Sequence, residues 1–336
     1  MTPPPGEGTR GQAPRVLVVT FALDPTADYV LRELNAHGVP FWRTDLADFP
    51  SRSTLSAVLG ADGRWCGAMQ GSGSAARGVD LSQVRAVWWR KPTPFAFPET
   101  MSGPEQAFAA SQAKRAVSGV LGSLPGVLWV NRPERNADCT KPRQLAAAAE
   151  AGLCVPETLI TNNPADVPPF AERCGGHIIT KVLGGIVHTE NNTRGQLYTH
   201  RVQPERWTDP RIALTAHLFQ REITDKAYEI RVTVVNGQSF PVAIHAPAGP
   251  APLDWRRDSR GLHYGTALLP PDVQRGIETL LRRLELVYAA LDFIVDSNGT
   301  HYLVDVNPGG QWAWIDRTRG AITHALADLL EKGSTT

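Results

Sequence analysis

The chain has 336 residues, 42% of them hydrophobic and 20% charged, as is ordinary for a globular protein large enough for two or three domains. Its net charge of +1 gives no general attraction to nucleic acid or membrane surfaces, so we expect neither partner. Cys66, Cys139, Cys154 and Cys174 show no CxxC spacing, which argues against a metal cage or disulfide framework. No apolar run approaches a membrane span and residues 1–14 lack the core of a signal peptide, so we expect a cytoplasmic protein.

The first part of the chain alternates strands with helices. Residues 1–14 are rich in Pro and Gly and are expected to be a disordered tail. The elements that follow are predicted as a strand at 15–21, a helix at 26–37, a strand at 39–43, an antiparallel pair at 54–59 and 64–69, a strand at 84–90, a helix at 105–121 and a strand at 127–130. This order predicts a small α/β domain with a largely parallel sheet over residues 15–130.

Two further subdomains are expected, at 131–215 and 216–332. The first is predicted to hold helices at 141–151 and 164–174 and strands at 158–161, 177–183 and 196–202. The second is predicted to hold a strand at 217–223, hairpins at 228–246 and 291–306, and helices at 271–290 and 318–332. Residues 184–195 lack apolar periodicity, and they fit either a mobile cover over a ligand or an ordinary exposed hairpin loop.

The segment 291–312 carries the clearest chemical signal. Its Asn298-Gly299 pair predicts a two-residue hairpin turn, which places Asp292 opposite Asp305 and Asn307 on the same face. The other face is predicted to point into a core, with Leu291, Phe293, Val295, Tyr302, Val304 and Val306. Opposed carboxylates repel each other, so acids and an amide oxygen on one face favour a hard cation such as Mg²⁺. Ordinary solvent-facing acids are the alternative.

Three cationic residues could complete such a site. Lys141 stands at a helix start, Lys181 lies in the middle of an apolar strand, and Arg231 is on the polar face of a hairpin. A buried unpaired charge is costly, so Lys181 is expected to meet an anion, whereas Lys141 alone could simply be solvated. Cations and a metal-binding acid pair together indicate a nucleotide triphosphate site, and the sequence has no P-loop pattern to supply one in another way.

These residues carry a family resemblance. The Lys141 helix start, the Lys181 strand, the run 220–223 and the pattern Asp292…Asp305-Val306-Asn307-Pro308 resemble the ATP-grasp carboxylate–amine ligases over about residues 15–330. The resemblance implies an α/β protein with α+β subdomains, in which an ATP-grasp fold follows an N-terminal pre-ATP-grasp α/β domain.

The resemblance also implies roles for single residues. It puts Lys141 and Lys181 on ATP, and Asp292, Asp305 and Asn307 on Mg²⁺. It gives the contacts to adenine and ribose to Gln220, Arg221, Glu222, Ile223 and Asp225, and it makes Arg231 and Lys181 the catalytic residues that stabilise the transferring phosphoryl group. Glu is more usual in this family at the position of Asp305, but Asp keeps the charge.

A narrower resemblance rests on four short motifs. The runs WWRKP at 88–92, YEIRV at 228–232, DWR at 254–256 and NPGGQW at 307–312 look like the ATP-grasp maturases of ribosomal peptides, the graspetide or microviridin type. This implies a precursor peptide with a leader segment as partner, a homodimer, and omega-ester or omega-amide bonds from Asp or Glu side chains to Ser, Thr or Lys. The residues assigned to the peptide are Arg90, Asp254, Trp255, Arg256 and Arg257; a solvated loop is the alternative for the last two.

Two other functions stay open at this stage. A ligase for a small amino-acid-like substrate, in the manner of glutathione synthetase, would share every ATP residue named above. A nucleotide- or peptide-binding module without turnover is the alternative from another class. The intact set of Lys, Arg and oxygen ligands argues against the module, because a degenerate site usually shows a lost ligand.

Overall fold

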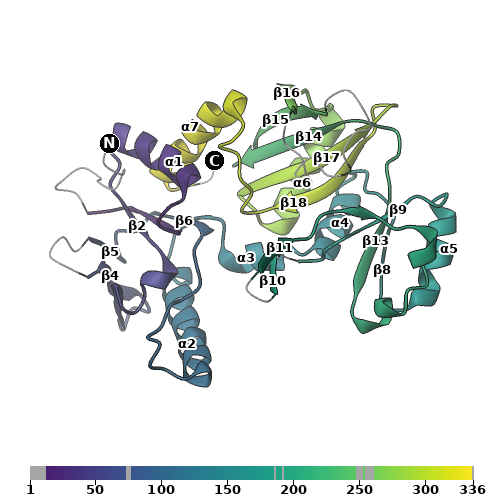
Figure 1. The fold of residues 1–336 in the computed structure, drawn as a ribbon. Coiled ribbons are helices and arrows are strands. Elements are labelled where there is room, and N and C mark those ends of the chain that lie inside the picture. Colours follow the sequence, from purple (N-terminus) through teal and green to yellow (C-terminus); the bar gives the residue numbers. More distant parts are fainter. Residues whose placement is uncertain are drawn as a thin grey trace.

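A computed structural model describes residues 13–72, 77–184, 187–190, 193–246, 253 and 261–334 (Figure 1). Asp254, Trp255, Arg256 and Arg257, which the sequence suggests for peptide binding, lie outside the described residues. So do residues 1–12 of the predicted tail and four residues of the predicted loop, 185–186 and 191–192.

A parallel four-stranded sheet forms near the N-terminal end of the described chain, as the sequence predicts. Its order is β2 (Phe41–Thr44), β1 (Val16–Thr20), β6 (Ala86–Lys91) and β7 (Leu128–Val130). Alternate residues of β1 face opposite sides: Val16 and Val18 pack under α1 (Pro25–Ala36), and Leu17 and Val19 under α2 (Gly103–Gly122). Parallel sheets are buried on both faces, which explains the continuous apolar run of β1.

A small antiparallel sheet packs beside α2. It consists of β3 (Ser53–Leu59), β4 (Trp65–Gly71) and β5 (Gly78–Asp80). The pair β3–β4 confirms the predicted antiparallel pair, and β5 adds a strand that the sequence did not signal. Met69 and Val79 join the core under α2.

A second four-stranded sheet stands in the middle of the chain. Its order is β12 (His200–Arg201), β9 (Ile178–Lys181), β13 (His217–Arg221) and β8 (Thr158–Thr161), all antiparallel. α5 (Val167–Arg173) covers one face through Val167 and Phe170. Within residues 184–195, for which the sequence allows a mobile cover or an exposed hairpin loop, the antiparallel strands β10 (Val187–Glu190) and β11 (Thr193–Gln196, which ends one residue later) pair with each other.

The largest sheet has five antiparallel strands. They run in the order β16 (His263–Thr266), β15 (Gln238–His245), β14 (Lys226–Val235), β17 (Tyr288–Asp296) and β18 (His301–Asn307). α4 (Lys141–Glu150) and α6 (Pro271–Leu284) cover one face, where Ile230, Val232 and Val234 are buried. The hairpin predicted at 228–246 is confirmed, and its turn lies at Asn236-Gly237, with both residues in the left-handed region.

The helix predicted to run to residue 290 ends six residues earlier. Glu285 adopts a left-handed conformation (φ 54°), and the N–H of Leu286 returns to the carbonyl of Leu281. This Schellman-type end stops the helix, and Tyr288 then begins β17. The apolar periodicity continued past the helix because the strand that follows is itself buried.

The β17–β18 hairpin confirms one prediction and corrects another. Asp292 does lie opposite Asp305, but the register shifts beside it, so that Phe293 pairs with Leu303 and Val304 is the extra residue of a bulge. Leu303 therefore enters the core, and placing Tyr302 and Val304 there was wrong. The turn is longer than two residues because the Asp296 N–H donates to the Thr300 carbonyl and the Asp296 carboxylate accepts the N–H groups of Asn298 and Thr300.

The last helix returns the chain to its beginning. α7 (Asp316–Lys332) lies beside α1 in Figure 1 and shares its core, where Leu31, Leu34 and Leu326 are fully buried. The remaining short elements are α3 (Pro133–Asp138) and the 3₁₀ turns η1 (Leu46–Asp48), η2 (Pro164–Asp166), η3 (Pro204–Arg206) and η4 (Pro210–Leu214). In the described part of the chain, no helix has both the length and the apolar character needed to cross a bilayer.

Asn131 ties the first sheet to the largest one. It lies between β7 and α3, is 2% exposed, and accepts the N–H groups of Val287 and Tyr288 at 2.8 and 2.9 Å. Its amide also donates to the carbonyls of Tyr288 and Pro308 at 2.8 and 3.1 Å. One side chain thus fixes both ends of the segment that contains the β17–β18 hairpin.

Replacing Asn131 by Ala should therefore destabilise the protein by about 3 kcal/mol, because buried backbone groups would lose their partners. Urea unfolding measures this as a lower midpoint. Asn162→Ala, at an exposed position, is the matched control and should stay within about 0.5 kcal/mol of wild type. Equal midpoints for the two variants would contradict the role given to Asn131.

Candidate nucleotide and metal site

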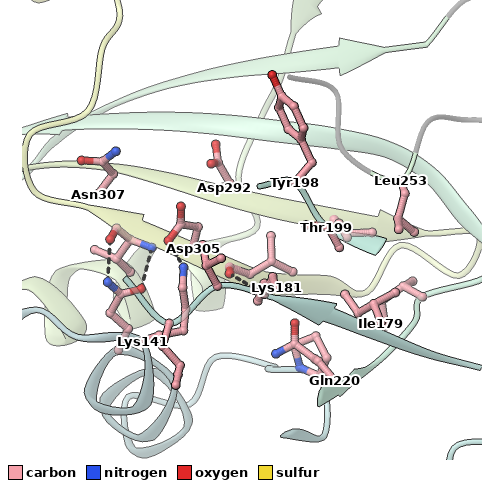
Figure 2. A pocket seen from close by; sticks show the side chains of 18 of the residues that line it. Lys141, Ile179, Lys181, Tyr198, Thr199, Gln220, Leu253, Asp292, Asp305 and Asn307 are labelled. Atoms are coloured by element: carbon pink, nitrogen blue, oxygen red, sulfur yellow. Dashed lines mark hydrogen bonds and ion pairs between the residues drawn. The ribbon is translucent and has the colours of Figure 1, made fainter. Parts of the chain in front are cut away.

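A cavity of about 770 Å³ opens between the middle sheet and the largest sheet (Figure 2). Its walls come from α4, β9, β13, β14, β17 and β18. Most of the residues that the sequence suggests for ATP and metal line this cavity. They are Lys141, Lys181, Gln220, Arg221, Glu222, Ile223, Asp292, Asp305 and Asn307. Segments up to 166 residues apart in the sequence therefore meet at one place.

The three predicted oxygen ligands share one edge of this cavity. Figure 2 shows Asp292, Asp305 and Asn307 close together on the hairpin, with Asp292 and Asp305 paired across the two strands. Asp292 is 3% exposed, Asp305 is half-buried and Asn307 is exposed. Asn307 Oδ1 accepts the N–H of Gly309 at 3.0 Å, which orients the amide.

Arg231 lies behind Asp292 instead of lining the cavity. It is 4% exposed, and its Nη1 donates to both carboxylate oxygens of Asp292 at 2.8 and 3.0 Å. Its Nη2 donates to the carbonyl of Gln311 at 3.1 Å. Arg231 therefore supports the hairpin acid from the rear, whereas the resemblance places it on the phosphoryl group.

The two lysines reach the hairpin from different elements. Lys141 begins α4 and forms an ion pair with Asp305. Lys181 ends β9 and donates to the carbonyl of Val304 at 2.9 Å. Val304 is the extra residue of the bulge, so the irregularity in the hairpin sets the carbonyl that Lys181 contacts.

The segment 220–225 lies at the other end of the cavity. Gln220 is fully buried; its Nε2 donates to Thr158 Oγ1 at 2.8 Å, and its Oε1 has no hydrogen-bond partner among the described residues. Glu222 accepts two hydrogen bonds from Arg201 Nε, at 2.8 and 3.0 Å. Asp225 does not line the cavity; it is exposed and accepts the hydroxyl of Ser297 at 3.0 Å.

The donor set fits a magnesium–nucleotide ligand. Mg²⁺ takes oxygen ligands, typically one or two carboxylates together with phosphate oxygens, and the hairpin edge offers two carboxylates and an amide oxygen. Lys141 and Lys181 stand beside that edge, where their ammonium groups could contact phosphate oxygens (Figure 2). A buried acceptor without a partner costs free energy, and the exocyclic amine of adenine is a donor that could satisfy Gln220 Oε1.

Several cavity residues were not singled out from the sequence. Glu229 is 9% exposed and accepts a bond from Lys226 at 2.9 Å; strand alternation in the sequence places it on the same polar face as Arg231, but no motif marks it as a cavity residue. Gln144 follows Lys141 by one helical turn, and its side chain both donates to and accepts from the backbone of Val306 at 2.8 and 3.1 Å. These two hydrogen bonds fix the start of α4 beside the hairpin, and no local sequence pattern signals them.

The cysteine in this cavity is not suited to nucleophilic chemistry. Burial raises the pKa of the Cys139 thiol to about 11, so it stays protonated at neutral pH. This agrees with the sequence, which offers no Ser-His or Cys-His arrangement.

Arg90 lies away from the cavity. Its Nε donates to Asp24 Oδ2 at 2.6 Å, and both side chains are almost fully buried. Burial alone would raise the pKa of Asp24, but the charge of Arg90 and hydrogen bonds from Arg90, Thr20 and the N–H of Ala27 together lower it. The role of Arg90 toward a peptide stays a prediction.

Known proteins resemble this chain in sequence over one part and in structure over nearly all of it. Residues 15–137 match the family model of the MvdD pre-ATP grasp domain. Among curated proteins no sequence matches. The structure of a RiPP-associated ATP-grasp ligase from Chryseobacterium gregarium, in complex with ADP and a leader and core peptide, superimposes with a TM-score of 0.85 at 22% identity, covering 96% of this chain and 97% of that one. The chain has an ATP-grasp fold.

Two further structures extend the comparison. The macrocyclase MdnC of Microcystis aeruginosa MRC, bound with precursor peptide MdnA, gives a TM-score of 0.81 at 26% identity and covers 95% of this chain and 100% of that one. The ATP-grasp ligase PsnB, complexed with a phosphomimetic variant of its minimal precursor, Mg and ADP, gives a TM-score of 0.76 at 21% identity. The match covers 96% of this chain and 99% of that one. The resemblance to ribosomal-peptide ATP-grasp ligases that the sequence indicates is confirmed.

Gly310→Ala should disturb the Arg231–Asp292 pair. A Cβ at Gly310 would lie 2.4 Å from the Cβ of Ala290 and 2.9 Å from Arg231 Nη2. We expect ATP turnover to fall about 100-fold, as small misplacements of catalytic groups can cause. ADP release in a coupled assay measures the loss.

Gly309→Ala is the matched control, because a Cβ there meets nothing closer than 3.6 Å. Its turnover should stay within a few-fold of wild type. Equal activity of the two variants would show that the close packing around Gly310 does not position Arg231.

Proposed function

We propose that this protein is an ATP-dependent ligase that joins Asp or Glu side-chain carboxylates of a ribosomal precursor peptide to Ser or Thr hydroxyls or Lys amines, releasing ADP and phosphate. The observation that carries the proposal is the meeting of Asp292, Asp305, Lys141 and Lys181 at one cavity in an ATP-grasp fold. Relatives with this fold are bound to ADP and to precursor peptides.

The residues of the cavity divide between the nucleotide and the metal. Lys141 and Lys181 would contact the phosphates, and Gln220 with the backbone around Ile223 would receive adenine. Asp292, Asp305 and Asn307 would hold Mg²⁺, which neutralises charge on the phosphates when bound. The pair of Lys141 with Asp305 would then open, since the lysine gains a phosphate partner and the carboxylate a metal.

The chemistry would proceed in two displacements. A carboxylate oxygen of the peptide attacks the γ-phosphorus, the bond to the bridging oxygen breaks, and ADP leaves with that electron pair. A hydroxyl or amine of the peptide then attacks the acyl carbon, loses its proton and expels phosphate. The outcome is an omega-ester or omega-amide bond, and no protein nucleophile takes part.

Arg231 would act mainly by holding Asp292. The two hydrogen bonds from its Nη1 reach both carboxylate oxygens of Asp292 and fix the orientation of that carboxylate. Lys181, which lines the cavity, would be the residue that touches the transferring phosphoryl group.

Some expectations from the sequence stay predictions beside this proposal. They are the homodimer, the cytoplasmic location, the leader segment as the bound part of the peptide, and the subdomain limits at 15–130, 131–215 and 216–332. Binding of PsnB to Mg and ADP supports the choice of metal, and complexes of relatives with leader and core peptides support the choice of partner.

Incubation of the protein with ATP, Mg²⁺ and an acidic short peptide encoded beside its gene tests the proposed function. We expect the peptide to lose one water mass for each bond formed, with ADP and not AMP accumulating. ADP without a change in peptide mass would contradict peptide ligation and favour a small-molecule ligase. No ADP with any peptide would favour a binding module.

Asp305→Asn should lower ADP formation by at least about 100-fold, because the site loses a charged metal ligand. The thermal midpoint should move little, since the hairpin core lies on the opposite face. Asp272→Asn, exposed in the first turn of α6, is the control and should retain activity. Full activity of Asp305→Asn would remove Asp305 from the metal site.

A further inference from the structure

Two histidines and three carboxylates cluster where the first and last helices meet. Glu33 lies in α1 and His37 is the C-cap residue that follows it, and His324, Asp328 and Glu331 lie in α7. Residues four apart lie on the same helix face, so the pairs 33/37 and 324/328 project together. None of the five lines the nucleotide cavity, so the cluster is separate from the site described above.

The donor atoms of three of these residues have the spacing of metal ligands. Glu33 Oε1 lies 3.6 Å from His37 Nε2 and 3.1 Å from His324 Nδ1, and donor atoms of the three residues all lie within 4.8 Å of one another. In a tetrahedral zinc site with ligands about 2.1 Å from the ion, adjacent ligand atoms are about 3.4 Å apart. The carboxylate oxygen thus already stands at this spacing from both imidazole nitrogens.

The other nitrogen of each imidazole is engaged by a further carboxylate. His37 Nδ1 lies 2.8 Å from Glu331 Oε2, and His324 Nε2 lies 3.5 Å from Asp328 Oδ2. Histidines that bind metals commonly donate their second N–H to a carboxylate, which fixes the tautomer and turns the remaining nitrogen toward the ion. This arrangement distinguishes the cluster from a chance gathering of surface acids.

The choice of ion follows from the ligand chemistry. Two imidazoles and one carboxylate suit Zn²⁺ and poorly suit Mg²⁺, which prefers oxygen. The side chains of His37 and His324 are 25% and 61% exposed, so an ion can enter from solvent and complete its shell with water. A second trio, His37 with Asp328 and Glu331, offers one imidazole in place of two and fits zinc less well.

We propose that Glu33, His37 and His324 form a zinc site that fastens α1 to α7, with Glu331 and Asp328 orienting the two imidazoles. Leu34 and Leu326 already pack in the core that the two helices share. An ion at the exposed side of this contact would join segments almost 300 residues apart, and it would do so independently of ATP.

Metal binding to chelator-treated protein tests the proposal directly. Zn²⁺ is titrated against a chromophoric chelator, and Co²⁺ is added separately to record its visible absorption. We expect one tightly bound Zn²⁺ per chain and a cobalt spectrum typical of four-coordination. His37→Ala and His324→Ala should each weaken zinc binding by about 100-fold, and Glu331→Gln by about tenfold through the loss of orientation.

Two controls separate this site from others. His177→Ala removes an exposed histidine outside the cluster, and Asp292→Asn removes a carboxylate of the nucleotide site; both should leave zinc affinity unchanged. Circular dichroism verifies that each variant is folded. Wild-type affinity in His324→Ala, loss of zinc in Asp292→Asn, or no tight zinc in wild type would overturn the proposal.

Discussion

The buried ion pair between Arg231 and Asp292 is the contact on which the candidate site depends. Two charges are removed from water here, which is tolerable only when geometry and extra hydrogen bonds are good. The guanidinium meets both carboxylate oxygens and also the carbonyl of Gln311, so β14, β17 and the turn after β18 are held by one side chain. A hairpin with two opposed acids is stable because each acid has a cationic partner. Arg231 pairs with Asp292 from behind, and Lys141 pairs with Asp305.

The same turn is linked to the N-terminal sheet. The Gln311 side chain accepts the hydroxyl of Thr26, whose N–H donates to Asp24, the partner of Arg90. The hydroxyl of Tyr288 donates to the carbonyl of Gly310 at 2.6 Å, and burial raises the pKa of Tyr288 to about 12, so this donor keeps its proton. Asn131 adds two further hydrogen bonds, since its amide donates to the carbonyl of Pro308 and accepts the N–H of Tyr288. The NPGGQW run of the sequence is thus the junction at which the pre-ATP-grasp sheet meets the hairpin.

Much of this arrangement could be predicted from the sequence, because its signals are local. The Asn-Gly pairs at 236–237 and 298–299 predict the two hairpins, and strand alternation puts Arg231 on the polar face. The bulge at Val304 could not be predicted, since it depends on how the Asp296 carboxylate organises a longer turn. The position of Arg231 behind Asp292, and the anchoring of α4 by Gln144, are tertiary contacts with no local pattern. The α1–α7 cluster was missed for the same reason: its members are almost 300 residues apart.

A crystal structure with ADP and Mn²⁺, the ion located by its anomalous scattering, tests the central claim most directly. The account predicts an ion bound by Asp292, Asp305 and Asn307, with adenine against Gln220 and with Lys141 turned from Asp305 to a phosphate. Arg231 should still hold Asp292 from behind. An ion bound elsewhere, or a nucleotide outside the cavity between the two sheets, would contradict it.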